Sequence, residues 1–204
     1  MALQRVDAIV LSAIRYGETS KIVRLATREL GVQSALARGA LRPKSRFGAA
    51  LHLLSEGQAG ILPARASDLH TLTEFDAQRI RTGLAGRLDR YAAASALAEL
   101  MLRAAPPAPL PAAYDLFRDA LGLLGLAPAE AVEPLALRTL WRLVTVLGFG
   151  PALDLCARDG EELPETGAVA FATGDGGALC PACARAHVGT RLGREDFDDL
   201  VAFV

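Results

Sequence analysis

This sequence has few cysteines and no long hydrophobic run, and each shortage excludes a class of protein. Three cysteines in 204 residues are too few for a disulfide framework, so their spacing is first considered as metal chemistry or packing. No stretch approaches the roughly 18 consecutive apolar residues that a membrane-spanning helix requires. The first ten residues lack a basic start followed by an apolar core, so we expect no secretory signal. Together these shortages predict a cytoplasmic protein.

The sequence also lacks the motifs of common enzyme active sites. It contains no phosphate-binding Gly-x-x-x-x-Gly-Lys-Ser/Thr loop, no Gly-x-Ser-x-Gly nucleophile elbow and no His-Glu-x-x-His zinc motif. The three histidines, His52, His70 and His187, are scattered along the chain. We therefore expect a protein that is not an enzyme.

Five short strand-like segments occupy the first 80 residues. They are rich in β-branched residues, partly alternating, and separated by turns that contain glycine. A small five-stranded barrel fits an OB-fold, which commonly binds single strands, although alternation alone does not distinguish it from an SH3-like barrel. The expected strands cover residues 5–14, 21–27, 31–38, 50–62 (with a break near 57–60) and 68–75.

From about residue 77 the pattern becomes helical, with apolar residues recurring every three or four positions. A Pro-rich segment at 106–111 separates the first two helices, and the third has Pro134 near its first turn and Gly148 at its end. A short terminal helix is expected at 196–203. The predicted fold class is α+β, with an OB-fold β-barrel at residues 1–80 and an α-helical domain at 81–204 that carries a zinc-ribbon-like hairpin.

Charge is unevenly distributed although the formal net charge is only −1. Residues 1–80 contain 11 Lys and Arg against 7 Asp and Glu, whereas residues 81–204 contain 11 against 16. Four cations crowd into residues 38–48, here called the basic loop, which contain no acid. Because clustered cations repel one another, the loop favours a polyanion such as DNA, with an ordinary solvated loop as the alternative. The candidate phosphate contacts are Arg38, Arg42, Lys44 and Arg46, with Lys21 and Arg24 from the preceding hairpin.

Aromatic residues, at 5% of the chain, are too few for extensive base stacking. The first 80 residues contain only Tyr16, Phe47 and Phe75. This scarcity favours contact with a nucleic-acid backbone over tight reading of its sequence.

The cysteines lie in a separate region, in a knuckle–hairpin–knuckle layout at about residues 153–187. Cys180 and Cys183 form one half of a zinc-site pattern, and Cys156 begins the other half, where Asp159 holds the position of the second cysteine. An aspartate can bind zinc through oxygen, and His187 is a substitute ligand. The sequence thus predicts one structural zinc ion on Cys156, Asp159, Cys180 and Cys183, with a metal-free hairpin as the alternative.

Several motifs occur together in an order that resembles the bacterial RecO family of recombination-repair proteins. The resemblance spans the strands, the helical region and the cysteine hairpin. It rests on Asp7-Ala-Ile-Val-Leu11, Tyr16-Gly-Glu18, Ala37-Arg-Gly-Ala40, Arg42-Pro-Lys-Ser-Arg-Phe-Gly48 and Leu147-Gly-Phe-Gly-Pro151 leading into Leu153-Asp-Leu-Cys156.

The resemblance implies an OB-fold followed by helices, often with a zinc-binding hairpin. It implies a non-enzymatic protein, located with the nucleoid, that binds single- and double-stranded DNA and anneals complementary strands. It also implies partnership with RecR and with the acidic C-terminal tail of single-strand binding protein, to help load RecA. The family's basic residues correspond to those of the basic loop and to Lys21 and Arg24, whereas Asp159 departs from the family's cysteine.

Two other functions remain open from the residues. One is a protein-interaction scaffold whose basic loop meets an acidic protein surface, with no direct role on DNA. The other is a zinc enzyme, which needs an open metal position and a nearby base such as Glu161, Glu162 or Glu165.

Overall fold

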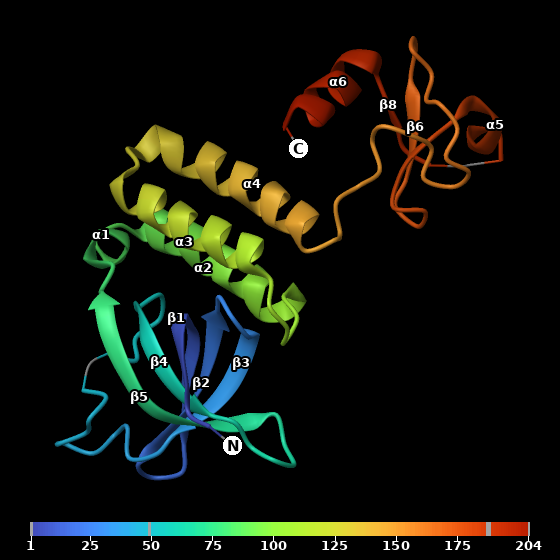
Figure 1. The fold of residues 1–204 in the computed structure, drawn as a ribbon. Coiled ribbons are helices and arrows are strands. Elements are labelled where there is room, and N and C mark those ends of the chain that lie inside the picture. The colour runs from blue at the N-terminus through green and yellow to red at the C-terminus, as the bar shows by residue number, and fades with distance from the viewer. Residues whose placement is uncertain (1, 49, 187–188, 204) are drawn as a thin grey trace. The chain divides into compact units, whose positions relative to one another are not determined.

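The computed structural model describes residues 2–48, 50–186 and 189–203 (Figure 1). The chain divides into two compact units, residues 1–140 and 141–204. Among the described residues, no helix is both long and apolar enough to cross a lipid bilayer.

The first unit begins with a closed five-stranded barrel in the order β1-β2-β3-β5-β4. All neighbouring strands are antiparallel except β3 and β5, which are parallel. Strand β1 pairs with β4 through its first half and with β2 through its second, and its register shifts between Val10 and Ser12, which allows the strand to bend. The strands are β1 (Gln4–Tyr16), β2 (Ser20–Thr27), β3 (Gly31–Ala37), β4 (Glu56–Leu62) and β5 (Leu69–Arg79).

Within the closed barrel, two glycines of β4 allow this strand to lie very close to β5. A Cβ atom on Gly57 would lie 2.0 Å from the carbonyl oxygen of Asp76, and one on Gly60 would lie 2.6 Å from the Thr73 hydroxyl. The predicted break near 57–60 is therefore wrong, because these glycines lie inside the strand and permit this approach. Residues 50–55, predicted as strand, form turns instead, in which Leu51 and Leu54 are buried.

Helices α2 and α3 lie against one end of the barrel, and the basic loop lies at the other end (Figure 1). The amide of Val32 donates to the carbonyl of Pro106, in the segment between these helices. The Arg28 guanidinium pairs with Asp115 on α3, and Arg81 pairs with Glu56 on β4. The helices are α1 (Thr82–Ala85), α2 (Leu88–Ala104), α3 (Pro111–Leu126) and α4 (Ala129–Val146).

Pro134 lies inside α4, not near its first turn as predicted, because the helix begins five residues earlier, at Ala129. Helix α4 also continues past residue 140, where the two compact units divide.

The second unit contains a small three-stranded sheet in the order β7-β6-β8. The glycine-rich turn expected from the sequence joins the first two strands of this sheet. A terminal helix is present, although the third strand was not expected. The elements are β6 (Val169–Ala172), β7 (Gly177–Leu179), α5 (Pro181–Ala184), β8 (Arg191–Leu192) and α6 (Arg194–Phe203).

The predicted α+β class is confirmed, with a closed five-stranded barrel of OB type followed by helices. The barrel core is formed by side chains that point inward from alternate positions, among them Val23, Leu25 and Ala35. The division into domains at residue 80 stays a prediction.

Candidate functional site

The basic loop is held in a series of tight turns. The amide of Arg42 donates to the carbonyl of Gly39 at 3.1 Å, and the amide of Ser45 donates to the carbonyl of Arg42 at 2.9 Å. Phe47 anchors the loop in the barrel core, where its side chain is 2% exposed, and the Arg46 guanidinium lies 5.3 Å from the Phe47 ring centre. The loop therefore presents its cations from an ordered backbone.

The loop is also joined to the β1–β2 turn. The amide of Leu41 donates to the carbonyl of Thr19 at 2.8 Å, and the amide of Gly39 donates to the Ser20 hydroxyl at 3.4 Å. These bonds connect residues about 20 positions apart in sequence. They place the end of the first hairpin beside Arg38.

The predicted cations have no acidic partners. Among the described residues, no ion pair involves Lys21, Arg24 or any cation of the basic loop. Elsewhere in the same unit, Arg5 pairs with Glu74 at 2.9 Å and Arg28 with Asp115 at 3.0 Å. Positive charge that is not neutralised internally is available to an external anion.

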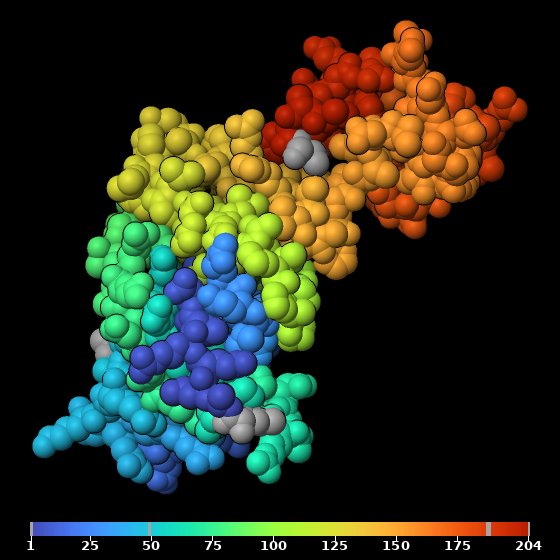
Figure 2. Space-filling model, viewed as in Figure 1, coloured from blue at the N-terminus to red at the C-terminus, as the bar shows by residue number. Residues whose placement is uncertain are grey.

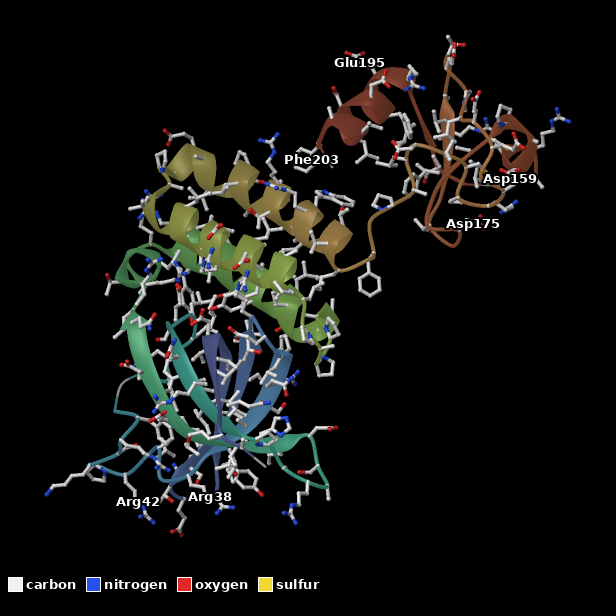
Figure 3. The ribbon with its side chains drawn as sticks, in the orientation of Figure 1. Arg38, Arg42, Asp159, Asp175, Glu195 and Phe203 are labelled. Carbon is white, nitrogen blue, oxygen red and sulfur yellow. The ribbon has the colours of Figure 1, made fainter. Side chains whose placement is uncertain are left out.

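The four cations of the basic loop gather at one end of the barrel, whereas Arg24 lies further along β2, where it pairs with Ser34 and lines a groove together with Leu102 of α2. Figure 2 shows the basic loop, in light blue, projecting from the end of the barrel away from α2 and α3. In Figure 3 the side chains of Arg38 and Arg42 point outward from this end. Arg38, Arg42, Lys44 and Arg46 are all exposed, so the structure brings the predicted residues of the loop onto one accessible surface.

Arg38 and Arg42 line a pocket together with the β1–β2 hairpin. Tyr16, Thr19 and Ser20 form the other side of this pocket. The tyrosine is 53% exposed, whereas Phe47 and Phe75, the other two aromatics of the barrel region, are buried. The sequence gives no direct signal for Thr19 and Ser20, because the backbone bonds across the barrel end bring them to the pocket.

The second unit brings together the four predicted metal ligands. One ligand atom from each of Cys156, Asp159, Cys180 and Cys183 can be chosen so that all four lie within 4.8 Å of one another. His187, predicted as a substitute ligand, lies outside the described residues.

Each half of this cluster is a tight turn that directs its side chains toward the other half. On one side the amide of Gly160 donates to the carbonyl of Cys156 at 2.9 Å. On the other side Cys180 precedes helix α5, and its sulfur accepts a hydrogen bond from the amide of Cys183 at 3.4 Å. Strands β6 and β7 hold the second turn in place against a small buried core.

The Asp159 carboxylate is the acceptor within the cluster. Hydrogen bonds from the thiols of Cys156 and Cys183 hold the pKa of Asp159 well below its usual range. The contact with Asp159, at 3.0 Å from the Cys183 sulfur, raises the pKa of the Cys183 thiol. The carboxylate is therefore charged at neutral pH, while metal binding at Cys183 requires loss of a proton.

Three sulfur atoms and one carboxylate oxygen supply the four donors of a tetrahedral structural zinc site, with the Asp159 oxygen in the place that a fourth Cys or a His takes in the usual sets. Cys156 and Cys180 are buried, which suits a structural site. The residues therefore fit one structural zinc ion, which would join the two turns that Cys156 and Cys180 begin.

Family models identify both parts of the chain. The model described as "Recombination protein O N terminal" matches residues 1–81, and the model described as "Recombination protein O C terminal" matches residues 85–191. The chain belongs to the RecO family.

Relatives named as DNA repair proteins support this membership over most of the chain. RecO of Rubrobacter xylanophilus is 36% identical over 188 residues, which cover 90% of this chain and 72% of the relative. RecO of Symbiobacterium thermophilum is 38% identical over 185 residues, with the same coverage. RecO of Bacillus cereus is 33% identical over 180 residues, which cover 87% of this chain and 69% of the relative. The comparisons thus support a role in DNA repair and recombination.

Proposed function

We propose that this RecO-family chain is a non-enzymatic mediator that binds single- and double-stranded DNA and anneals complementary strands. With RecR, it would help to load RecA on DNA coated by single-strand binding protein, whose C-terminal tail would be a second partner. The observation that carries the DNA-binding role is the exposed basic loop, whose four cations form no ion pair with any described residue.

The mechanism follows from the chemistry of these cations. Arg38, Arg42, Lys44 and Arg46 contact phosphates from the ordered basic loop, with Lys21 and Arg24 on the adjoining strand. Phosphate contacts fix the position of a strand without occupying the Watson–Crick edges of its bases. A strand held in this way can still pair with a complementary strand.

Each phosphate contact releases condensed counterions, so affinity should fall as salt rises. For single-stranded DNA the slope of log affinity against log salt changes by about 0.7 for each phosphate contact. Replacing two cations, with Arg42→Ala and Lys44→Ala, should therefore flatten the slope by about 1.4. Fluorescence anisotropy with a labelled oligonucleotide over a salt series measures this change.

Arg103→Ala is the matched control, because Arg103 is an exposed arginine on α2 that already pairs with Glu99. It should leave the slope unchanged. An affinity of the unsubstituted protein that does not depend on salt would refute the phosphate mechanism.

Annealing of two complementary labelled oligonucleotides tests the rest of the proposal. The protein should accelerate annealing, and a variant with all four cations of the basic loop changed to Ala should lose this effect while it stays folded. A chain that never accelerates annealing and binds DNA only weakly at physiological salt would instead be a protein-interaction scaffold.

A further inference from the structure

The barrel has an outward face on β1, β2 and β3 that continues the pocket beside the basic loop. Side chains on these strands alternate, and the odd-numbered Val23, Leu25 and Ala35 point into the core. The even-numbered side chains of β2 and β3 therefore point outward, as do those of β1 after its register shift.

This outward face carries apolar side chains between two cations at one end and a single cation, Arg24, at the other. Arg38 and Arg42 lie at one end, beside Tyr16. A neighbouring groove is lined by Ser12, Ile14, Ile22, Arg24, Ser34, Asp68, Leu69 and Leu102, so it contains one acid beside its one cation. Ile14 is 58% exposed, near the end of β1, where it pairs with Ile22 on β2.

The register places these groups at a definite spacing. Arg24 pairs with Ser34 on β3, four residues before Arg38. Four residues of a β-strand span about 13 Å, and Ile22 and Leu36 form a cross-strand pair between the two ends. Cations at both ends and hydrocarbon between them complement a single strand of DNA, because its phosphates and its bases are separately accessible.

Tyr16 is positioned to contact a base. Tyr16 is paired with Ser20 on β2, and the Ser20 hydroxyl accepts a hydrogen bond from the amide of Gly39. The backbone at Tyr16 is therefore linked to the backbone next to Arg38. The Arg15 guanidinium donates to the carbonyl of Gly17 at 3.1 Å and further fixes the turn. These bonds fix the backbone at Tyr16, and a tyrosine side chain has only two torsion angles to order when a base stacks on it.

We infer that this face is a subsite for unpaired bases, in which Tyr16 stacks on one base while Ile14, Ile22 and Leu36 contact its neighbours. The inference rests on the proposed DNA-binding function and adds a selectivity to it. In a duplex the base faces are stacked on one another, so an aromatic ring cannot stack on them unless the duplex is opened. Tyr16 therefore favours single strands over duplexes, whereas the cations serve both.

Three probes of equal length separate bases from phosphates: oligo(dT), an oligonucleotide of the same length made of abasic sites, and a hairpin duplex. The unsubstituted protein should bind oligo(dT) more tightly than the abasic strand. Tyr16→Ala should lower affinity for oligo(dT) about 5- to 10-fold, near the lower end of the effect of removing a stacking side chain, and leave the other two affinities unchanged. Tyr16→Phe should keep the preference for oligo(dT), because stacking needs the ring and not the hydroxyl.

Tyr91→Ala is the control, since Tyr91 is another exposed tyrosine but lies on α2. It should change none of the three affinities. If Tyr16→Ala lowers all three affinities equally, or none of them, the base subsite is refuted. If Arg38→Ala with Arg42→Ala weakens all three probes in the same experiment, the proposed function survives that result. If the unsubstituted protein binds none of the probes, both proposals fail.

Discussion

At the scale of single residues, the arginines of this chain serve two separate purposes. Arg28 and Arg81 form ion pairs that join the barrel to the helical part of the first unit. The cations of the basic loop have no such partners among the described residues and are exposed. A count of charges does not distinguish the two groups, because the distinction depends on which acids fold next to them.

The pair between Arg28 and Asp115 predicts a dependence of stability on pH. The Arg28 guanidinium holds the pKa of Asp115 below its usual value. The pair therefore stabilises the folded state above the unfolded pKa of about 3.9, and this contribution is lost as the pH falls through the lower, folded-state pKa. Asp115→Asn should lower the free energy of unfolding at pH 7 by about 0.5–1 kcal/mol, because the pair is half-exposed.

Urea denaturation at a series of pH values measures this effect. The difference in free energy of unfolding between the unsubstituted protein and Asp115→Asn should shrink as the solution is acidified below pH 4. Asp198→Asn is a comparison on α6, since Asp198 forms an ion pair with Arg194 in the second unit. A difference for Asp115→Asn that stays constant down to pH 2 would contradict the assignment.

Asp159 illustrates what spacing can predict at this scale. The ligand set was predictable because each half is a local turn with ligands three residues apart, and such turns fold in the same way wherever they occur. Tyr16 was identifiable as an aromatic but not as part of a pocket. Its position depends on backbone bonds between two turns that are distant in sequence.

At the scale of elements, the barrel depends on close approach between β4 and β5. Gly57→Ala would place a methyl group 2.0 Å from the carbonyl oxygen of Asp76, so a strand must shift. We expect a loss of about 2 kcal/mol or more in the free energy of unfolding, measured by urea denaturation.

Gly125→Ala in α3 is the matched control. No atom lies within 4 Å of a Cβ at this position, and alanine favours a helix over glycine. The free energy of unfolding of this variant should rise by up to about 1 kcal/mol. Equal stability of the two variants would show that the contact at Gly57 is relieved without cost.

Errors in the predicted elements fall at residues whose local preference differs from their place in the fold. Glycines at 57 and 60 indicate a break when only local conformation is considered, but in the barrel they are required by the neighbouring strand. Pro134 indicates a helix start, yet α4 begins at Ala129 and continues through the proline. At the two glycines the contact with β5 outweighs local preference, whereas the alternation of the other strands and the spacing of the helices were sufficient to predict them.

At the scale of the whole molecule, the two compact units should respond independently to metal. Zinc would connect two turns within residues 156–183, and all four of its candidate ligands belong to the second unit. Removing zinc from the metal-loaded protein with a chelator should lower the hydrogen-exchange protection of amides in β6, β7 and α5, and leave the barrel strands unchanged.

Asp159→Cys restores four sulfur ligands and should slow this loss of protection at a given chelator concentration. Asp159→Ala removes a ligand and should accelerate it. Protection that is the same with and without zinc in all three proteins would refute a structural metal. Loss of protection in the barrel as well would refute the independence of the two units.

The composition of the cation surface has a consequence for how a cell could control it. Arginine keeps its charge at every physiological pH, so acidification of the cell cannot weaken the surface by deprotonation. Acetylation of side-chain amines also has little to act on, because only Lys21 and Lys44 among the six cations are lysines. If this surface binds DNA as proposed, a bound strand is released by competition, from salt or from another anionic partner, and not by chemical neutralisation of the loop.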